Sequence, residues 1–151
     1  MKRIIASLLA GLCLLALVGC SAGSKADSAA PKDYSQIIHD ARTDEDNEYD
    51  MIFTKGEDGS YESFAASVSS MMVRSYAVAI VKPAEGKTDA VKAALEAYVQ
   101  SEQQSMEHYL EDQYLVAKAA TVTVAPTGEV VLVCAEDHDT ILSNIEKALA
   151  A

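Results

Sequence analysis

The stretch from Arg74 to Ala135 constrains the fold most, because it contains the apolar segments best able to nucleate a core. Residues 76–81 are apolar on both faces, which is typical of a strand that is central in a sheet or covered on both sides. Residues 121–124 alternate between polar and apolar, as a half-buried strand does, and a turn at 126–128 leads into an apolar segment at 130–134. The last two segments are therefore predicted to form an antiparallel pair.

Amphipathic periodicity predicts a long helix between the first two of these strands. It begins at Thr88, a candidate N-cap, and its apolar stripe continues for about six turns to Leu110. A last helix begins at Asp137 or Asp139, and a short one capped by Asp33 covers residues 33–42. The pattern predicts an α+β fold of two layers, with the helices on one face of a small antiparallel or mixed sheet. A split βαβ unit and a meander both remain open.

The segment before this core is less regular. Residues 51–54 are apolar and are compatible with a helix or a strand. After a glycine-rich turn, residues 60–72 place Tyr61, Phe64 and Val68 at helical spacing. We therefore expect a helix here, with Ser60 or Ser63 as a candidate cap.

The N-terminus has the composition of an export signal. Lys2 and Arg3 precede about fifteen mostly apolar residues, which is too short for a comfortable membrane span. The final four residues, Leu17-Val18-Gly19-Cys20, resemble the lipobox of bacterial lipoproteins. That resemblance implies cleavage between Gly19 and Cys20 and lipidation of Cys20.

The predicted organisation is a signal peptide at 1–19, a lipidated cysteine with a flexible tether at 20–32, and one α+β domain at 33–151. Two acyl chains on Cys20 would anchor the domain to the cell membrane on its extracytoplasmic face. The formal charge is −11, and it becomes −13 when the two leader cations are removed (−11 − 2). Because such a polyanion is repelled by phosphates, nucleic acid is not an expected partner. The expected partners are membrane lipid, through acylated Cys20, and an envelope protein.

No residue pattern predicts a catalytic, cofactor or metal site. The acidic run at 43–50 fails as an EF-hand, because Tyr49 and Lys55 occupy the positions that require glycine and glutamate. Met71 and Met72 could suit a cuprous ion, but core filling is the expected role without further soft ligands nearby in sequence. Cys134 is expected to be a small buried hydrophobe. The three histidines are dispersed: His39, His108 and His138.

Met71 to Leu149 resembles a family of Gram-positive bacterial lipoproteins, the domain of unknown function 4358 family. The resemblance is carried by the apolar pattern at 71–82, by Tyr109-Leu-Glu-Asp-Gln-Tyr114 and by the closing strand at 130–133. It implies extracellular anchoring and an α+β fold, and it brings no catalytic residues. Tyr109, Gln113 and Tyr114 are expected to pack at a helix end.

The leading hypothesis is a membrane-anchored extracytoplasmic lipoprotein with a non-catalytic binding or interaction domain. The alternative is a surface hydrolase that uses acidic residues, which would require two carboxylates and a histidine in one concave site. A transporter's solute-binding component is disfavoured by the size of the chain, because such proteins usually have two lobes.

Overall fold

The computed structural model describes residues 32–43, 50–54, 56 and 58–151. Contacts divide the chain into residues 1–30 and residues 31–151, and only the second unit is described below. The predicted signal peptide, the lipidation site at Cys20 and most of the tether lie outside the described residues.

A five-stranded sheet forms the centre of the unit, in the order β1-β2-β3-β5-β4, with every neighbouring pair antiparallel. The strands are β1 (Asp50–Phe53), β2 (Tyr61–Ser69), β3 (Ala77–Pro83), β4 (Thr121–Val124) and β5 (Val130–Cys134). The first three strands form a meander, and β4 and β5 form a hairpin that returns to β3. Strands β3 and β4 both run antiparallel to β5, which lies between them, and α2 and α3 connect them, so this part of the chain is a split βαβ unit.

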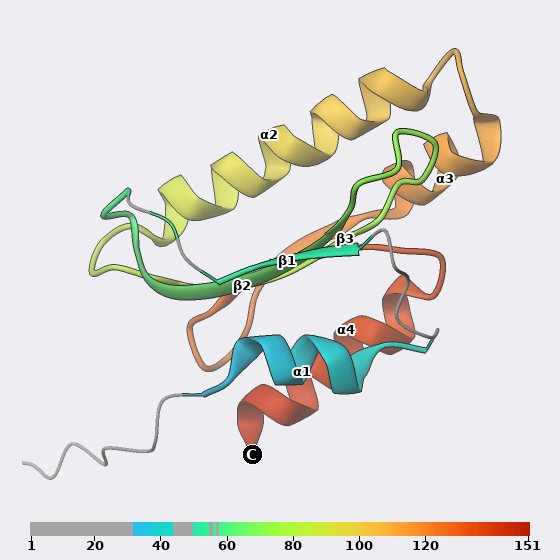
Figure 1. Ribbon diagram of the computed structural model, residues 1–151. Helices are drawn as coiled ribbons and strands as arrows, with labels where there is room; N and C mark the ends of the chain where they lie inside the picture. The colour runs from blue at the N-terminus through green and yellow to red at the C-terminus, as the bar shows by residue number, and fades with distance from the viewer. Residues whose placement is uncertain (1–31, 44–49, 55, 57) are drawn as a thin grey trace, which may run out of the picture. The chain divides into compact units, whose positions relative to one another are not determined.

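Helices cover both faces of this sheet, as Figure 1 shows. One face carries α1 (Tyr34–Ala41) and α4 (His138–Ala150), and the other carries α2 (Thr88–Met106) and α3 (Glu111–Ala119). The α+β class and the antiparallel sheet are confirmed. The expectation that the helices pack on one face was wrong, since the sheet lies between two helical layers.

The alternation of side chains along β3 and β5 explains the second helical layer. In β3, Val78 and Ile80 pack with α1 and α4, whereas Ala77 and Ala79 pack with α2 and α3. Strand β5 is likewise buried along its whole length. Successive side chains point to opposite faces of a strand, so a strand that is apolar at every position needs cover on both sides.

The expected helix at 60–72 was wrong, because β2 occupies most of that segment. The register with β3 shifts between Tyr61 and Ser63, as at a β-bulge. This irregularity places Tyr61 and Phe64 in the same apolar cluster although they are three residues apart. The spacing of three residues between Tyr61 and Phe64 therefore resembles the apolar spacing of a helix. Residues 51–54, left open above, contribute most of β1.

The long helix ends earlier than predicted, at Met106, and the chain folds back into α3. At 1.5 Å per residue, α2 is already about 28 Å long, whereas the seven residues of β3 span about 23 Å. Further turns would have no sheet beneath them. Folding back buries Ala117 against Val99, and Gln103 Nε2 donates to the Ala117 carbonyl at 3.1 Å.

The caps agree with the sequence in part. Asp33 caps α1, and its side chain accepts hydrogen bonds from the backbone N–H groups of Ser35 and Gln36. Thr88 is the first residue of α2 rather than its cap, and the Asp137 side chain does not cap α4. Helix α4 nevertheless buries the predicted face, with Ile141, Ile145 and Leu149 in the core.

Candidate functional site

The strand register brings two connections together at one end of the sheet. Ala77 of β3 pairs with Cys134 of β5, so the residues just outside them, Tyr76 and Ala135, lie side by side. The first belongs to the β2–β3 connection and the second to the β5–α4 connection. The start of α3 reaches the same place, where the backbone N–H of Ser75 donates to Gln113 Oε1 at 2.9 Å.

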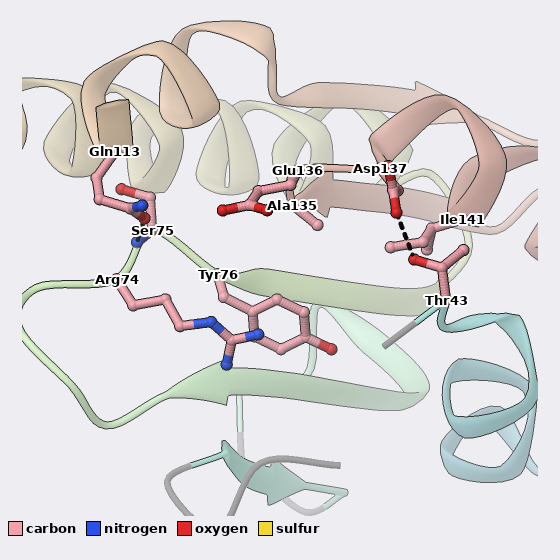
Figure 2. Close-up of a pocket in the computed structure, with 9 residues that line it drawn as sticks. All are labelled: Thr43, Arg74, Ser75, Tyr76, Gln113, Ala135, Glu136, Asp137 and Ile141. Carbon is pink, nitrogen blue, oxygen red and sulfur yellow. Dashed lines mark hydrogen bonds between the residues drawn. The ribbon is translucent and has the colours of Figure 1, made fainter. Parts of the chain in front are cut away.

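A cavity of about 170 Å³ lies at this junction, and we call it the serine cavity (Figure 2). Its wall combines hydrogen-bond donors, carboxylates and one aromatic ring. The lining residues are Thr43, Arg74, Ser75, Tyr76, Gln113, Ala135, Glu136, Asp137 and Ile141.

Ser75 is the unusual member of this wall. The residue is only 2% exposed, and its hydroxyl has no hydrogen-bond partner among the described residues. A buried hydroxyl without a partner costs about 1–3 kcal/mol. Because the hydroxyl oxygen is itself buried, the side chain would have to rotate toward the cavity to meet a water molecule or a bound ligand group.

The two carboxylates of the serine cavity point in different directions. Asp137 Oδ2 accepts a hydrogen bond from Thr43 Oγ1 at 2.8 Å. Figure 2 shows the Glu136 side chain extending away from this pair, toward Ser75. Glu136 is therefore the carboxylate available to an occupant of the cavity.

A buried ion cluster supports the other side of the wall. Asp50 lies between two guanidinium groups, with Arg42 Nη2 at 2.9 Å and Arg74 Nη1 at 2.7 Å. Both guanidinium groups also lie over the Tyr76 ring, at 4.9 and 4.4 Å from its centroid. The side chains of Arg42 and Asp50 are 3% and 4% exposed. The cluster joins β1 to the residue after α1 and to the β2–β3 connection.

A second cavity, of about 240 Å³, shares Arg74 and Tyr76 with the first. We call it the methionine cavity, because three methionines line it. Burial raises the pKa of Glu102 in this wall, and it raises the pKa of Tyr98 to about 12, with Glu102 adding to the effect. The lining residues are Ser69, Ser70, Met71, Met72, Arg74, Tyr76, Tyr98, Glu102, Ser105 and Met106.

Cys134 is buried, as its place in an apolar strand predicts. Its Sγ donates to the carbonyl of Ser75 at 3.8 Å. Burial, and then the charge of Glu102, raises the pKa of the Cys134 thiol to about 12. The group therefore remains a neutral thiol rather than a nucleophilic thiolate.

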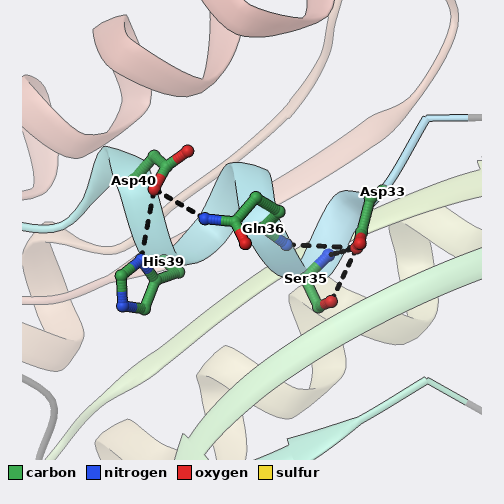
Figure 3. Close-up of polar contacts among 5 residues, drawn as sticks. All are labelled: Asp33, Ser35, Gln36, His39 and Asp40. Atoms are coloured by element: carbon green, nitrogen blue, oxygen red, sulfur yellow. Dashed lines mark hydrogen bonds and ion pairs between the residues drawn. The ribbon is translucent and has the colours of Figure 1, made fainter.

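None of the three histidines lines either cavity. Figure 3 shows His39 on α1, where its Nδ1 lies 3.2 Å from Asp40 Oδ1, which also accepts from Gln36. His138 Nε2 lies 3.3 Å from Asp139. Within residues 32–43 and 50–151, leaving out positions 55 and 57, no three His, Cys, Asp or Glu side chains gather as a metal site.

Of the residues expected to pack at a helix end, only Gln113 reaches a cavity. Tyr109 is exposed, and Tyr114 lies 5.5 Å from Lys118 Nζ. Asp50, the last residue of the acidic run at 43–50, is buried between two arginines. Residues 44–49 of the run lie outside the described part of the chain.

Sequence reasoning missed the most informative wall residues, which are Arg74, Ser75 and Glu136. They are distant in sequence from Gln113, and the register of β3 against β5 brings them together. An available signal was the pair of polar residues, Arg74 and Ser75, directly before an entirely apolar strand.

We expect Asp50→Asn to destabilise the domain by about 3–5 kcal/mol, because it removes the carboxylate between two largely buried guanidinium groups. Urea denaturation measures the change. The matched control is Glu62→Gln, which breaks the exposed pair with Lys82 and should cost about 0–1 kcal/mol. Equal effects of the two substitutions would contradict the structural role of the cluster.

Cys134 should be almost unreactive in the native protein. Its pKa rises from 9.0 to about 12, so near pH 8 the thiolate fraction is about a thousandfold lower than in the unfolded chain. The neutral thiol favours the folded state below pH 9, and this contribution is lost as the pH rises toward 12. Iodoacetamide labelling with and without urea, in a Cys13→Ser and Cys20→Ser background, measures the difference. Comparable rates in both states would refute it.

No curated protein and no solved structure matches the chain significantly. The model of one family, described as Domain of unknown function (DUF4358), matches residues 57–135, slightly more than half of the chain. The match runs from just before β2 to the end of β5, and it includes the β2–β3 connection that forms a wall of both cavities. The chain therefore belongs to this family, which confirms the family resemblance drawn from its sequence.

Proposed function

We propose that the chain is a lipoprotein anchored on the extracytoplasmic face of the cell membrane, whose domain is a binding module for a small polar solute. The serine cavity is the binding site in this proposal. The observation that carries it is the buried Ser75 hydroxyl, which lines a cavity and has no partner among the described residues. Buried hydroxyls in folded proteins are almost always hydrogen-bonded, so an orphaned one at a cavity is evidence for an occupant.

The chemistry of the wall indicates a solute with both positive and negative character. Arg74 and Gln113 bring hydrogen-bond donors that Asp50 and Asp112 engage only in part, and Glu136 supplies an acceptor with negative charge. A free amino acid satisfies both requirements, because its carboxylate suits a guanidinium and its ammonium group suits a carboxylate. At about 170 Å³ the cavity is smaller than the roughly 300–1,000 Å³ of drug-sized sites, which favours a small molecule.

The anchoring half of the proposal is supported by the N-terminal sequence. Lys2 and Arg3, the apolar run and the box ending at Cys20 agree with one another. In the described part of the chain, no helix combines the length and apolar character needed to cross a membrane. An envelope protein remains an additional proposed partner, recruited near the membrane by the same anchor.

One observation favours the alternative of a surface hydrolase. Two carboxylates, Glu136 and Asp137, line one cavity, and His138 follows them in sequence. A general acid and a general base must reach the same reacting group. Here Asp137 is engaged by Thr43, and Glu136 extends the other way (Figure 2). This geometry supports binding more than catalysis.

The anchor predicts an acyl mass on Cys20. Wild-type chain expressed in a bacterium that processes lipoproteins should incorporate an alkyne-labelled fatty acid and remain with the membrane fraction. Cys20→Ser should lose both properties, whereas Cys13→Ser, which alters a leader cysteine, should retain them. Label in the Cys20→Ser chain, or membrane association without label, would disprove anchoring at this residue.

The binding site predicts that small zwitterions bind through Glu136. Saturation-transfer NMR with glycine, L-serine and L-glutamate, and with glucose as an uncharged comparison, should detect an amino acid. Glu136→Gln removes the acceptor charge and should weaken binding by about tenfold or more, corresponding to at least about 1.4 kcal/mol. Glu107→Gln alters an acid outside both cavities and should have no effect. Equal affinities for the two variants would place the site elsewhere.

A further inference from the structure

The methionine cavity gathers three of the five methionines in the chain. Met71 and Met72 come from the β2–β3 connection, and Met106 is the last residue of α2. Met1 lies outside the described residues, and Met51 is on β1, outside this cavity. Met106 lies 34 positions after Met72 in the sequence, so folding alone brings these residues to one cavity.

Core filling accounts for only part of this arrangement. Met106 is 3% exposed and packs as a core residue, but Met72 is 88% exposed. A large apolar side chain in solvent contributes nothing to the core. The turn that presents it is ordered by hydrogen bonds, from Met71 N to Ser69 Oγ at 3.1 Å and from Arg74 N to the Met71 carbonyl at 3.2 Å. A turn of defined backbone conformation therefore holds Met72 beside the cavity.

Thioether sulfur is a soft ligand that binds without losing a proton, and it selects cuprous ions over harder cations. We propose that Met71, Met72 and Met106 bind one cuprous ion through their Sδ atoms. This metal differs from the zinc, calcium and magnesium classes, which use the His, Cys and carboxylate clusters that the described residues lack.

The surroundings of the cavity suit a monovalent cation. Met106 ends α2, and the C-terminus of a helix carries partial negative charge. Glu102 lines the same cavity one turn earlier. Arg74, the cation in the wall, is held toward Asp50 by an ion pair at 2.7 Å. The Cys134 thiol is buried and donates to the Ser75 carbonyl, so the three thioethers are the sulfur ligands of the proposed site.

The test is competition for cuprous ion against bathocuproine disulfonate under anaerobic conditions. The chain carries Cys13→Ser and Cys20→Ser, so that Cys134 is its one thiol. We expect the wild-type chain to bind one ion. The triple variant Met71→Leu, Met72→Leu and Met106→Leu should bind at least about tenfold more weakly, because removing even the groups that orient metal ligands usually costs that much affinity. Leucine keeps the volume of methionine, so the fold should survive, and circular dichroism verifies this.

Two further variants make the result decisive. Met51→Leu removes a methionine outside the cavity and should leave the affinity unchanged. Cys134→Ala should also retain binding. A wild-type chain that fails to compete, a triple leucine variant that competes as well as wild type, or loss of binding on Cys134→Ala alone would each overturn the proposal.

A second readout assigns the ligands directly. In a chain labelled with ¹³C at the methionine methyl groups, silver ion, a redox-inert substitute for cuprous ion, should shift the resonances of Met71, Met72 and Met106. The resonance of Met51 should stay in place. An equal shift of the Met51 resonance would show non-specific binding and refute the site. Unchanged resonances of the three cavity methionines would also refute it.

Discussion

The structure depends on the pairing of β3 with β5, because both strands bury apolar side chains on both faces. Val78 packs beneath one helical layer, and its neighbour Ala79 packs beneath the other. Removing these side chains from water is the main favourable term in folding, and one layer of helices could cover only half of them. Two helical pairs are therefore required. The chain supplies them from segments that precede β1, follow β5 and connect β3 to β4.

The same pairing creates the candidate site. Because Ala77 pairs with Cys134, the β2–β3 and β5–α4 connections next to these residues lie side by side. Ion pairs then fix the wall between the cavities. The Asp50 carboxylate pairs with the guanidinium groups of Arg42 and Arg74, and both guanidinium groups lie over the Tyr76 ring. Burying these ions has a large desolvation cost, which their attraction offsets only when the geometry is complete. The wall is therefore held by an ion cluster, which ties the residue after α1, outside every strand, to β1 and to the β2–β3 connection.

Much of the fold could be predicted from periodicity and capping. The strands β3, β4 and β5 and the helices α1 and α4 follow from local patterns that tertiary packing reinforces. Strand β2 could not be predicted, since its register shift gives Tyr61 and Phe64 a helical spacing. The end of α2 was also hidden, because no glycine or proline marks it and the length of the sheet decides it. The strand at 76–81 is apolar on both faces, which already implied a second helical layer. The sequences of the helices did not indicate which face of the sheet each would cover.

The cavities were harder to predict than the fold for a specific physical reason. The local sequence shows which chemical groups the side chains carry. Which of these side chains meet at a cavity depends on the strand register and on where the helices end. Met71 and Met72 suggest a soft ligand only once α2 stops at Met106, and Ser75 becomes an orphaned hydroxyl only once the β3–β5 pairing buries it. The two cavities also differ in chemistry, with thioethers in one and hydroxyl, amide and carboxylate groups in the other. One ligand class would not compete for both, and the side chains of Arg74 and Tyr76, which line both cavities, are a direct structural link between them.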